Sequence, residues 1–230
     1  LGGIEGPRAL ARAAAPASGP ASAASIAASV TPPDQAAARV EALTAGWARA
    51  LGGVEALRGI TSVHQLGVVD GHGQSGDLDE WVMVDGRHRQ NIDFLGRWNV
   101  LTVFDGTRGW SVDAEGVRHV LRGDDLAGEY TDAWLAAFAW AFPGRRPGTL
   151  EYGGRAAAGR EERLIARPAR GLPVTIVFDR AGGLPVRVET PAGDKIRTIA
   201  LLDWRPVGGV LFPFGYRQST GDIRDDVSIV

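Results

Sequence analysis

Residues 174–217 read VTIVFDRAGGLPVRVETPAGDKIRTIALLDWRPVGGVLFPFGYR, and this stretch decides the fold. Three of its segments carry apolar residues at every second position: Val174, Ile176 and Phe178, then Leu184, Val186 and Val188, then Val210, Phe212, Phe214 and Tyr216. A period of two is typical of a β-strand, whose successive side chains point to opposite faces. Sequences with the glycine or proline of a tight turn lie between the segments, at 181–183, 191–194 and 206–209. The stretch therefore predicts four consecutive antiparallel strands with one apolar face.

The first half of the chain shows the same alternation. It predicts strands at 60–69, 78–84, 88–94, 98–104, 110–113 and 117–121. Asp-Gly pairs at 85–86 and 105–106 favour hairpin turns, because glycine readily takes the positive φ that these turns require. Strands resume at Leu150 and Arg163. We expect this half to be a meander of antiparallel neighbours.

Two helices are predicted beside these strands. The first is expected at 31–51, between the start signal Thr31-Pro32-Pro33-Asp34 and the stop signal Gly52-Gly53. The second is expected at 124–142, where one stripe of residues is spaced by four: Leu126, Tyr130, Trp134, Phe138 and Phe142. Such a stripe must pack on another apolar surface, and only the sheet supplies one. The order of helix, sheet, helix and sheet predicts an α+β fold.

Composition limits the classes of function. The 230 residues are 44% hydrophobic, carry a net charge of −2 and contain no cysteine. Interspersed charges of both signs give no footprint for nucleic acid, so no such partner is expected; Arg145-Arg146 is interpreted as a solvated turn. The absence of cysteine excludes disulfides and thiolate metal sites. Seven tryptophans favour a large apolar surface.

The two ends differ from the middle. Residues 1–30 are mostly Ala, Ser, Gly and Pro, which predicts a disordered tail or the remnant of a secretory signal. Residues 31–230 are then a single domain. Because the sequence stops at Ile229-Val230 inside an alternating segment, we expect this domain to be truncated at its C-terminus.

Polar residues do not group into a recognisable catalytic or metal site. The densest acid cluster is Asp77, Asp79 and Glu80, and its place at a hairpin favours solvated carboxylates over acid/base catalysis. The four histidines, at 64, 72, 88 and 119, lack metal-ligand spacing, and the serines at 62, 75 and 111 lack a nucleophile elbow. We expect no catalytic residue, no metal and no cofactor.

Four strings of sequence are similar to the LolA-like family, the periplasmic outer-membrane lipoprotein sorting proteins and their relatives. They begin at Ala50 (ALGGVEAL), Phe104 (FDGTRGW), Phe178 (FD, followed by LPVR) and Asp203 (DWR, followed by GVLFPF). Their order and separation carry the resemblance, which covers about Val40 to Gln218.

The resemblance implies a strongly curved antiparallel sheet, an incomplete β-barrel of about ten strands, covered by the N-terminal and the mid-chain helix. It also implies a non-enzymatic periplasmic or secreted domain that receives a lipid or lipoprotein acyl chains, with a membrane-protein partner. Some relatives precede a retropepsin-like aspartic protease domain, so the alternative is an N-terminal accessory domain of a larger secreted enzyme. The chain contains no Asp-Thr-Gly or Asp-Ser-Gly tripeptide, so a protease domain would follow Val230.

Apolar residues on several strands are the candidate lining of the concave face. They are Trp81, Met83, Trp98, Val100, Trp110, Phe178, Val186, Val188, Phe212 and Phe214. Burying an acyl chain among them is favourable by about 0.8 kcal/mol per methylene. The alternative is that each of these residues packs beneath a helix and meets no ligand. The sequence leaves the oligomeric state open.

Overall fold

One large antiparallel sheet dominates the computed structural model, which describes residues 32–71, 73–156, 159–180 and 183–230. The predicted tail at 1–30 and His72 lie outside these residues. The strands are β1 Ser62–Gly71, β2 Gln74–Met83, β3 His88–Asp93, β4 Asn99–Phe104, β5 Gly109–Val112, β6 Arg118–Val120, β7 Gly148–Ala156, β8 Glu161–Pro168, β9 Val174–Asp179, β10 Pro185–Ala192, β11 Lys195–Val207, β12 Val210–Ser219 and β13 Val227–Ile229. The helices are α1 Pro33–Ala50, α2 Val54–Gly59, α3 Gly123–Ala136 and the short 3-10 turn η3 Ile223–Asp225.

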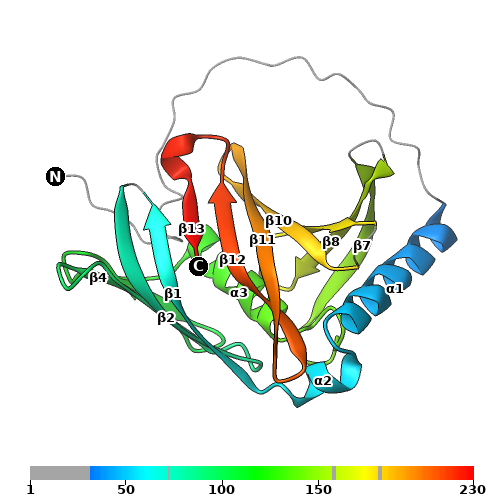
Figure 1. The fold of residues 1–230 in the computed structure, drawn as a ribbon, viewed down its shortest axis with the longest axis horizontal. Coiled ribbons are helices and arrows are strands. Elements are labelled where there is room, and N and C mark those ends of the chain that lie inside the picture. Colours follow the sequence, from blue (N-terminus) through cyan, green and yellow to red (C-terminus); the bar gives the residue numbers. More distant parts are fainter. Residues whose placement is uncertain (1–31, 72, 157–158, 181–182) are drawn as a thin grey trace.

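The sheet curls but does not close. Its strand order is β6-β5-β4-β3-β2-β1-β13-β12-β11-β10-β9-β8-β7, and the end strands β6 and β7 are not paired with each other in the described part of the chain. Figure 1 shows the two halves of the sheet, β1 to β4 and β7 to β12, flanking α3. The predicted α+β class and incomplete barrel are confirmed, with thirteen strands where about ten were expected.

The three-residue strand β13 joins the two halves of the sheet. β13 inserts between β1 and β12 and pairs three residues with each, Val69 to Gly71 on one side and Tyr216 to Gln218 on the other. Beyond these residues, no strand in the described part of the chain is paired with both β1 and β12. The alternation seen at Ile229 in the sequence thus belongs to a strand at the centre of the sheet.

Helix α1 packs on the inner face of β7 to β9, which we define as the face that bears Leu164 and Ile176. Trp47 of α1 stacks on Trp140 with ring centroids 3.8 Å apart and meets Phe178 edge-on at 5.4 Å. Gly52, just after α1, has a φ of +122°, and a Cβ there would lie 2.2 Å from the carbonyl oxygen of Gly209. Glycine is therefore required where α1 meets the β11–β12 hairpin.

Helix α3 is shorter than predicted, because it ends at Ala136 and not at 142. Phe138 has a φ of +50°, and the Ala139 N–H donates to the carbonyl oxygen of Trp134, so the chain turns back at this point. The turn carries Trp140 into the core against α1. The predicted stripe does pack inward: Tyr130, Trp134 and Phe138 are buried.

The interpretation of Arg145-Arg146 as a solvated turn was wrong. Arg146 donates to the carbonyl oxygens of Asp85, at 2.7 Å, and Gly106, at 3.0 Å, so it binds both predicted Asp-Gly hairpins. Arg145 donates to the carbonyl oxygens of Ala137 and Arg58. Backbone carbonyl groups at turns require hydrogen-bond donors. The guanidinium of Arg146 supplies them to two hairpins that are distant from it in the sequence.

We expect Trp134→Ala to lower the free energy of unfolding by about 3 to 5 kcal/mol, as for other buried aromatic residues. The Trp134 residue is 2% exposed, whereas Trp81 on β2 is 44% exposed and provides a matched control. Urea unfolding should show a loss for Trp81→Ala of about 1 kcal/mol or less. Equal losses for the two variants would mean that α3 contributes no more to the core than a surface side chain.

Candidate functional site

The ten candidate lining residues fall on two faces of the sheet. Six point to the inner face by strand alternation and pairing: Trp98, Val100, Phe178, Val188, Phe212 and Phe214. Three point to the outer face: Trp81, Met83 and Trp110. Val186 lies in an irregularity between Pro185 and Arg187, where the pairing of β10 with β9 shifts.

Strand register explains this division. Trp81 is opposite Arg89, Arg89 is opposite Val103, and Val103 is opposite Trp110. The neighbouring row joins Leu78, Ile92 and Val100, which form part of a buried cluster. Directly opposed residues share a face, so each row lies on one face. Arg89 and Ile92 are three positions apart on β3, an odd number, so the two rows lie on opposite faces. The sequence pattern predicted that these aromatic residues lie in strands, but it did not predict how the strands pair.

The six inward residues also differ in burial. Val100 and Phe178 are buried in separate core clusters, and Trp98 stacks on Phe94 at 3.9 Å. Phe214 is exposed, with the guanidinium of Arg205 at 5.0 Å from its ring centroid. Val188 and Phe212 are half-buried beside the core cluster that contains Phe178, and Trp98 is half-buried beside the cluster that contains Val100.

Central strands add inner apolar residues that were not predicted. Ile199 is opposite Val188, while Leu201 and Ile229 are each opposite Tyr216. All are half-buried. We call the set Val188, Ile199, Leu201, Phe212 and Ile229 the apolar inner surface. Apolar residues on both faces of β11, such as Leu201 and Leu202, obscured its pattern in the sequence.

A row of polar residues crosses the inner face next to this surface. Gln65 of β1 is opposite Glu80, Glu80 is opposite Gln90, Gln90 is opposite Thr102, and Thr102 is opposite Ser111. The Gln90 amide donates to Glu80 at 3.1 Å. These five residues, here called the polar row, occupy one position on each of five neighbouring strands. The sequence of a single strand does not reveal such a row, because the pairing of neighbouring strands brings its residues together.

The polar row meets α3 at a buried histidine. His88 Nε2 lies 2.8 Å from Glu80 Oε1, and His88 Nδ1 lies 3.2 Å from Glu129 Oε2. The side chains of His88 and Glu129 are 5% and 3% exposed. Both ring nitrogens of His88 are therefore in contact with a carboxyl group, one on the sheet and one on α3. Glu129 was not predicted, since it lies within a helix and its partner is 41 residues away.

Tyr216 lies at the other end of the row. Its burial, helped by the negative charge of Glu80, raises the pKa of Tyr216 to about 12, while a hydrogen bond with Gln65 acts in the opposite direction. The phenol therefore stays neutral over the whole physiological range. Tyr216 thus joins the polar row to the apolar inner surface.

The predicted acid cluster is divided between the faces. Asp77 and Asp79 share the outer face, as expected from their spacing, whereas Glu80 points inward. Asp79 contacts His64 at 3.0 Å and Arg89 at 3.6 Å. The three carboxylates therefore do not form one group. Among the described residues no cluster of His, Asp and Glu has the arrangement of a metal site.

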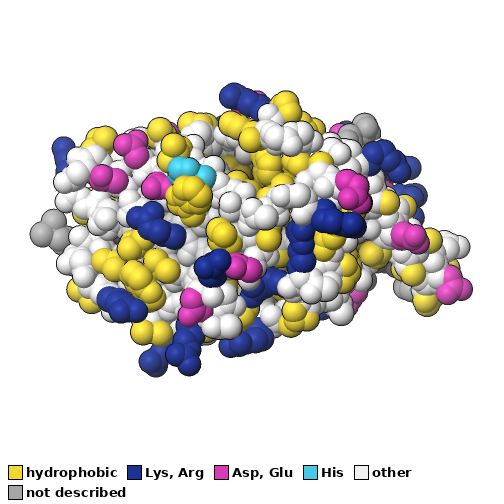
Figure 2. All heavy atoms as spheres, turned by 90° about the horizontal axis from the view of Figure 1, so that it is seen from below, with side chains coloured by type: hydrophobic (Ala, Val, Ile, Leu, Met, Phe, Trp, Pro, Cys, Tyr) yellow, Lys and Arg dark blue, Asp and Glu magenta, His cyan; other side chains and the backbone are white. Residues whose placement is uncertain are grey.

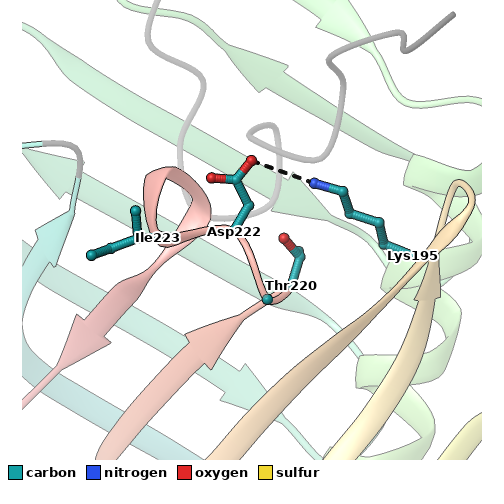
Figure 3. A pocket seen from close by; sticks show the side chains of 5 residues that line it. Lys195, Thr220, Asp222 and Ile223 are labelled. Carbon is teal, nitrogen blue, oxygen red and sulfur yellow. Dashed lines mark ion pairs between the residues drawn. The ribbon is translucent and has the colours of Figure 1, made fainter.

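One hollow of about 580 Å³ lies at the rim of the sheet, lined by Lys195, Thr220, Gly221, Asp222 and Ile223. Figure 3 shows Lys195 reaching from the β10–β11 turn toward Asp222 beside η3. The ammonium lies 3.7 Å from Asp222 and 3.4 Å from Asp225, so its charge is already compensated.

A second view of the molecule, from below, shows apolar side chains exposed in a hollow among charged ones (Figure 2).

Comparisons with solved structures show the fold. A LolA superfamily protein from Nitrosomonas europaea aligns with a TM-score of 0.52 and 10% identity, over 83% of this chain and 89% of its own. A DUF1329 family protein from Desulfovibrio piger ATCC 29098 aligns with a TM-score of 0.51 and 12% identity, over 83% and 90%. No family model and no curated protein matches the sequence. In the described residues, no helix has the length and apolarity needed to cross a membrane.

We expect Tyr216→Phe to flatten the alkaline loss of stability. Because the pKa is about 12 in the folded protein and about 10 in an unfolded chain, the unfolded state releases the proton first as pH rises. Stability from this group is complete below pH ~10 and falls as pH rises toward ~12. Urea unfolding at pH 9 and 11 should show a smaller loss for the variant than for the parent. An identical loss would show that Tyr216 ionises as an ordinary phenol.

Proposed function

We propose that this chain is a non-enzymatic periplasmic or secreted domain that binds a hydrophobic ligand, a lipid or the acyl chains of a lipoprotein, on the inner face of its curved sheet. The observation that carries the proposal is the apolar inner surface, whose residues are half-buried although they face inward at the centre of the sheet. The fold shared with a LolA superfamily protein supports it.

Such binding would be driven by removal of the acyl chain from water and would not require a charged or hydrogen-bonding side chain. Each methylene removed from water contributes about 0.8 kcal/mol, before the cost of ordering the chain. Val188, Ile199 and Leu201 offer a contact surface on adjacent strands β10 and β11. A ligand on this surface would cover apolar area that the two long helices leave open. Binding should therefore depend on chain length more than on any single side chain.

A membrane-protein partner is part of the proposal, because a carrier must exchange its ligand with a membrane. The apolar side chains of Leu66, Trp81 and Leu202 are exposed on the outer face, where such a partner could contact them. No observation favours the alternative of an accessory domain for a larger secreted enzyme.

The test is binding of a fluorescent acyl probe to paired variants. Leu201 points inward, and Leu202, the next residue, points outward and is 43% exposed. We expect Leu201→Asp to weaken binding by at least 10-fold, because it places a charge on the apolar surface, and Leu202→Asp to change it by less than 2-fold. Competing alcohols with longer chains should displace the probe at lower concentration, by about 4-fold per methylene.

Two results would contradict the proposal. One is an equal effect of the two aspartate variants, which would place the probe away from the inner face. The other is displacement that does not depend on chain length. Circular dichroism of both variants checks that each remains folded.

A further inference from the structure

The edge of β1 that faces β13 is paired over only part of its length. Val68 and Val230 exchange two backbone hydrogen bonds, of 2.7 and 3.0 Å, so the N–H and C=O groups of Val68 point toward β13. Backbone groups alternate in direction along an antiparallel strand, so those of Leu66, His64 and Ser62 point to the same side. In the described part of the chain no backbone group is bonded to them on that side. This half of β1 is therefore a free edge near the centre of the sheet.

Strand β12 lies on the other side of this free edge. Because β13 pairs with both β1 and β12, these two strands are two strand spacings, about 10 Å, apart where β13 lies between them (Figure 1). Farther along β12, the Leu211 N–H donates to the carbonyl oxygen of Leu51, in the linker between α1 and α2. We call the stretch between residues 62–66 of β1 and 212–215 of β12 the pairing gap. It is bounded by two strands, β13 and this linker.

The two faces of the pairing gap differ. On the inner face Tyr216 of β12 is hydrogen-bonded to Gln65 of β1, so the tyrosine side chain crosses from one strand to the other. On the outer face Leu66 is 70% exposed. Successive residues of an extended segment point to opposite faces. A segment in the gap therefore needs small side chains toward Tyr216, and apolar side chains on its outer face would remove Leu66 from water.

The pairing of β13 also indicates how a further strand would lie. β13 is antiparallel to both of its neighbours, and a segment in line with it would have residues opposite Leu66 and His64. The end strands of the sheet suit an added strand less well. β6 has three residues, including the exposed Arg118, and β7 has an irregularity between Tyr152 and Arg155. Short, charged or bulged strands are features that protect sheet edges from pairing.

We infer that the pairing gap binds an extended segment of a partner polypeptide, which runs antiparallel to β1 and bonds to the backbone groups of Leu66 and His64. The inference goes beyond the acyl ligand of the proposed function and does not depend on it. Backbone hydrogen bonds supply the affinity of such strand addition, and the side chains at alternate positions supply its specificity. The segment has small residues facing inward and apolar residues beside Leu66.

The probe is a fluorescently labelled peptide, Gly-Ser-Val-Ser-Val-Ser-Gly, which alternates small and apolar side chains. Amide hydrogen exchange, followed by NMR, locates its binding. In the free chain the N–H groups of Leu66 and His64 should exchange faster than those of Gln65 and Gly67, which point toward β2. A saturating concentration of the probe should slow exchange at Leu66 and His64 by about 10-fold or more and leave Gln65 and Gly67 unchanged.

Two variants at one position separate the backbone from the side chain. Leu66→Ala and Leu66→Pro both remove the leucine side chain, but only proline also removes the N–H group. Proline is tolerated where the N–H group is not part of the strand pairing, and circular dichroism checks that the variant is folded. Fluorescence anisotropy should show binding to Leu66→Pro that is about 10-fold weaker than binding to Leu66→Ala. If Leu66→Pro does not fold, N-methylation of the two valines of the probe removes the donors that face β1 and should weaken binding to the native chain by a similar factor.

Several outcomes would overturn the inference. One is exchange at Leu66 and His64 in the free chain that is as slow as at Gln65, which would show that this edge of β1 is already paired. Others are the absence of probe binding, equal binding to the two variants, or slowed exchange at another edge, such as Leu150 of β7. Protection of Leu66 that rises with protein concentration in the absence of the probe would show that the occupant is a second copy of this chain and not a partner.

Discussion

The structure depends on one constraint: a sheet that curls without closing has an inner face that other elements must cover. Helix α3 meets this requirement between the two halves of the sheet. Tyr130 packs on Phe104 of β4, and Trp134 packs in the cluster that contains Leu164 of β8. One helix thus holds together strands from opposite ends of the strand order. Removal of its large side chains would leave both halves with apolar surface exposed to water.

Coverage by α3 and α1 is incomplete, and this gives the inner face its functional interest. The strands next to β13 carry inward apolar residues that are only half-buried, such as Ile199 and Ile229. Beside them the row from Gln65 to Ser111 brings hydrogen-bonding groups to the same face. The pairing of the strands therefore places an apolar region and a polar region next to each other on one face.

Local patterns in the sequence predicted most of the elements. Alternation located the strands around Val174 and Val210, the Asp-Gly pairs located hairpins, and Pro33 with Gly52 located the ends of α1. Each of these signals depends on residues close together in the chain. The end of α3 was missed because Phe138 takes a left-handed conformation, after which Trp140 stacks on Trp47, a residue distant in the sequence. Arg146 was missed because its partners are two hairpins distant in sequence.

The sequence by itself determined the class of fold, the two long helices and the antiparallel order of consecutive strands, since these follow from periodicity and turn chemistry. Only the tertiary structure decided which face each strand presents inward. A shift of one residue in register moves every side chain to the other face, and no local pattern records that shift. Trp81 and Trp110 therefore lie outside, while Leu201, Tyr216 and the polar row, which the sequence did not single out as a site, lie together inside.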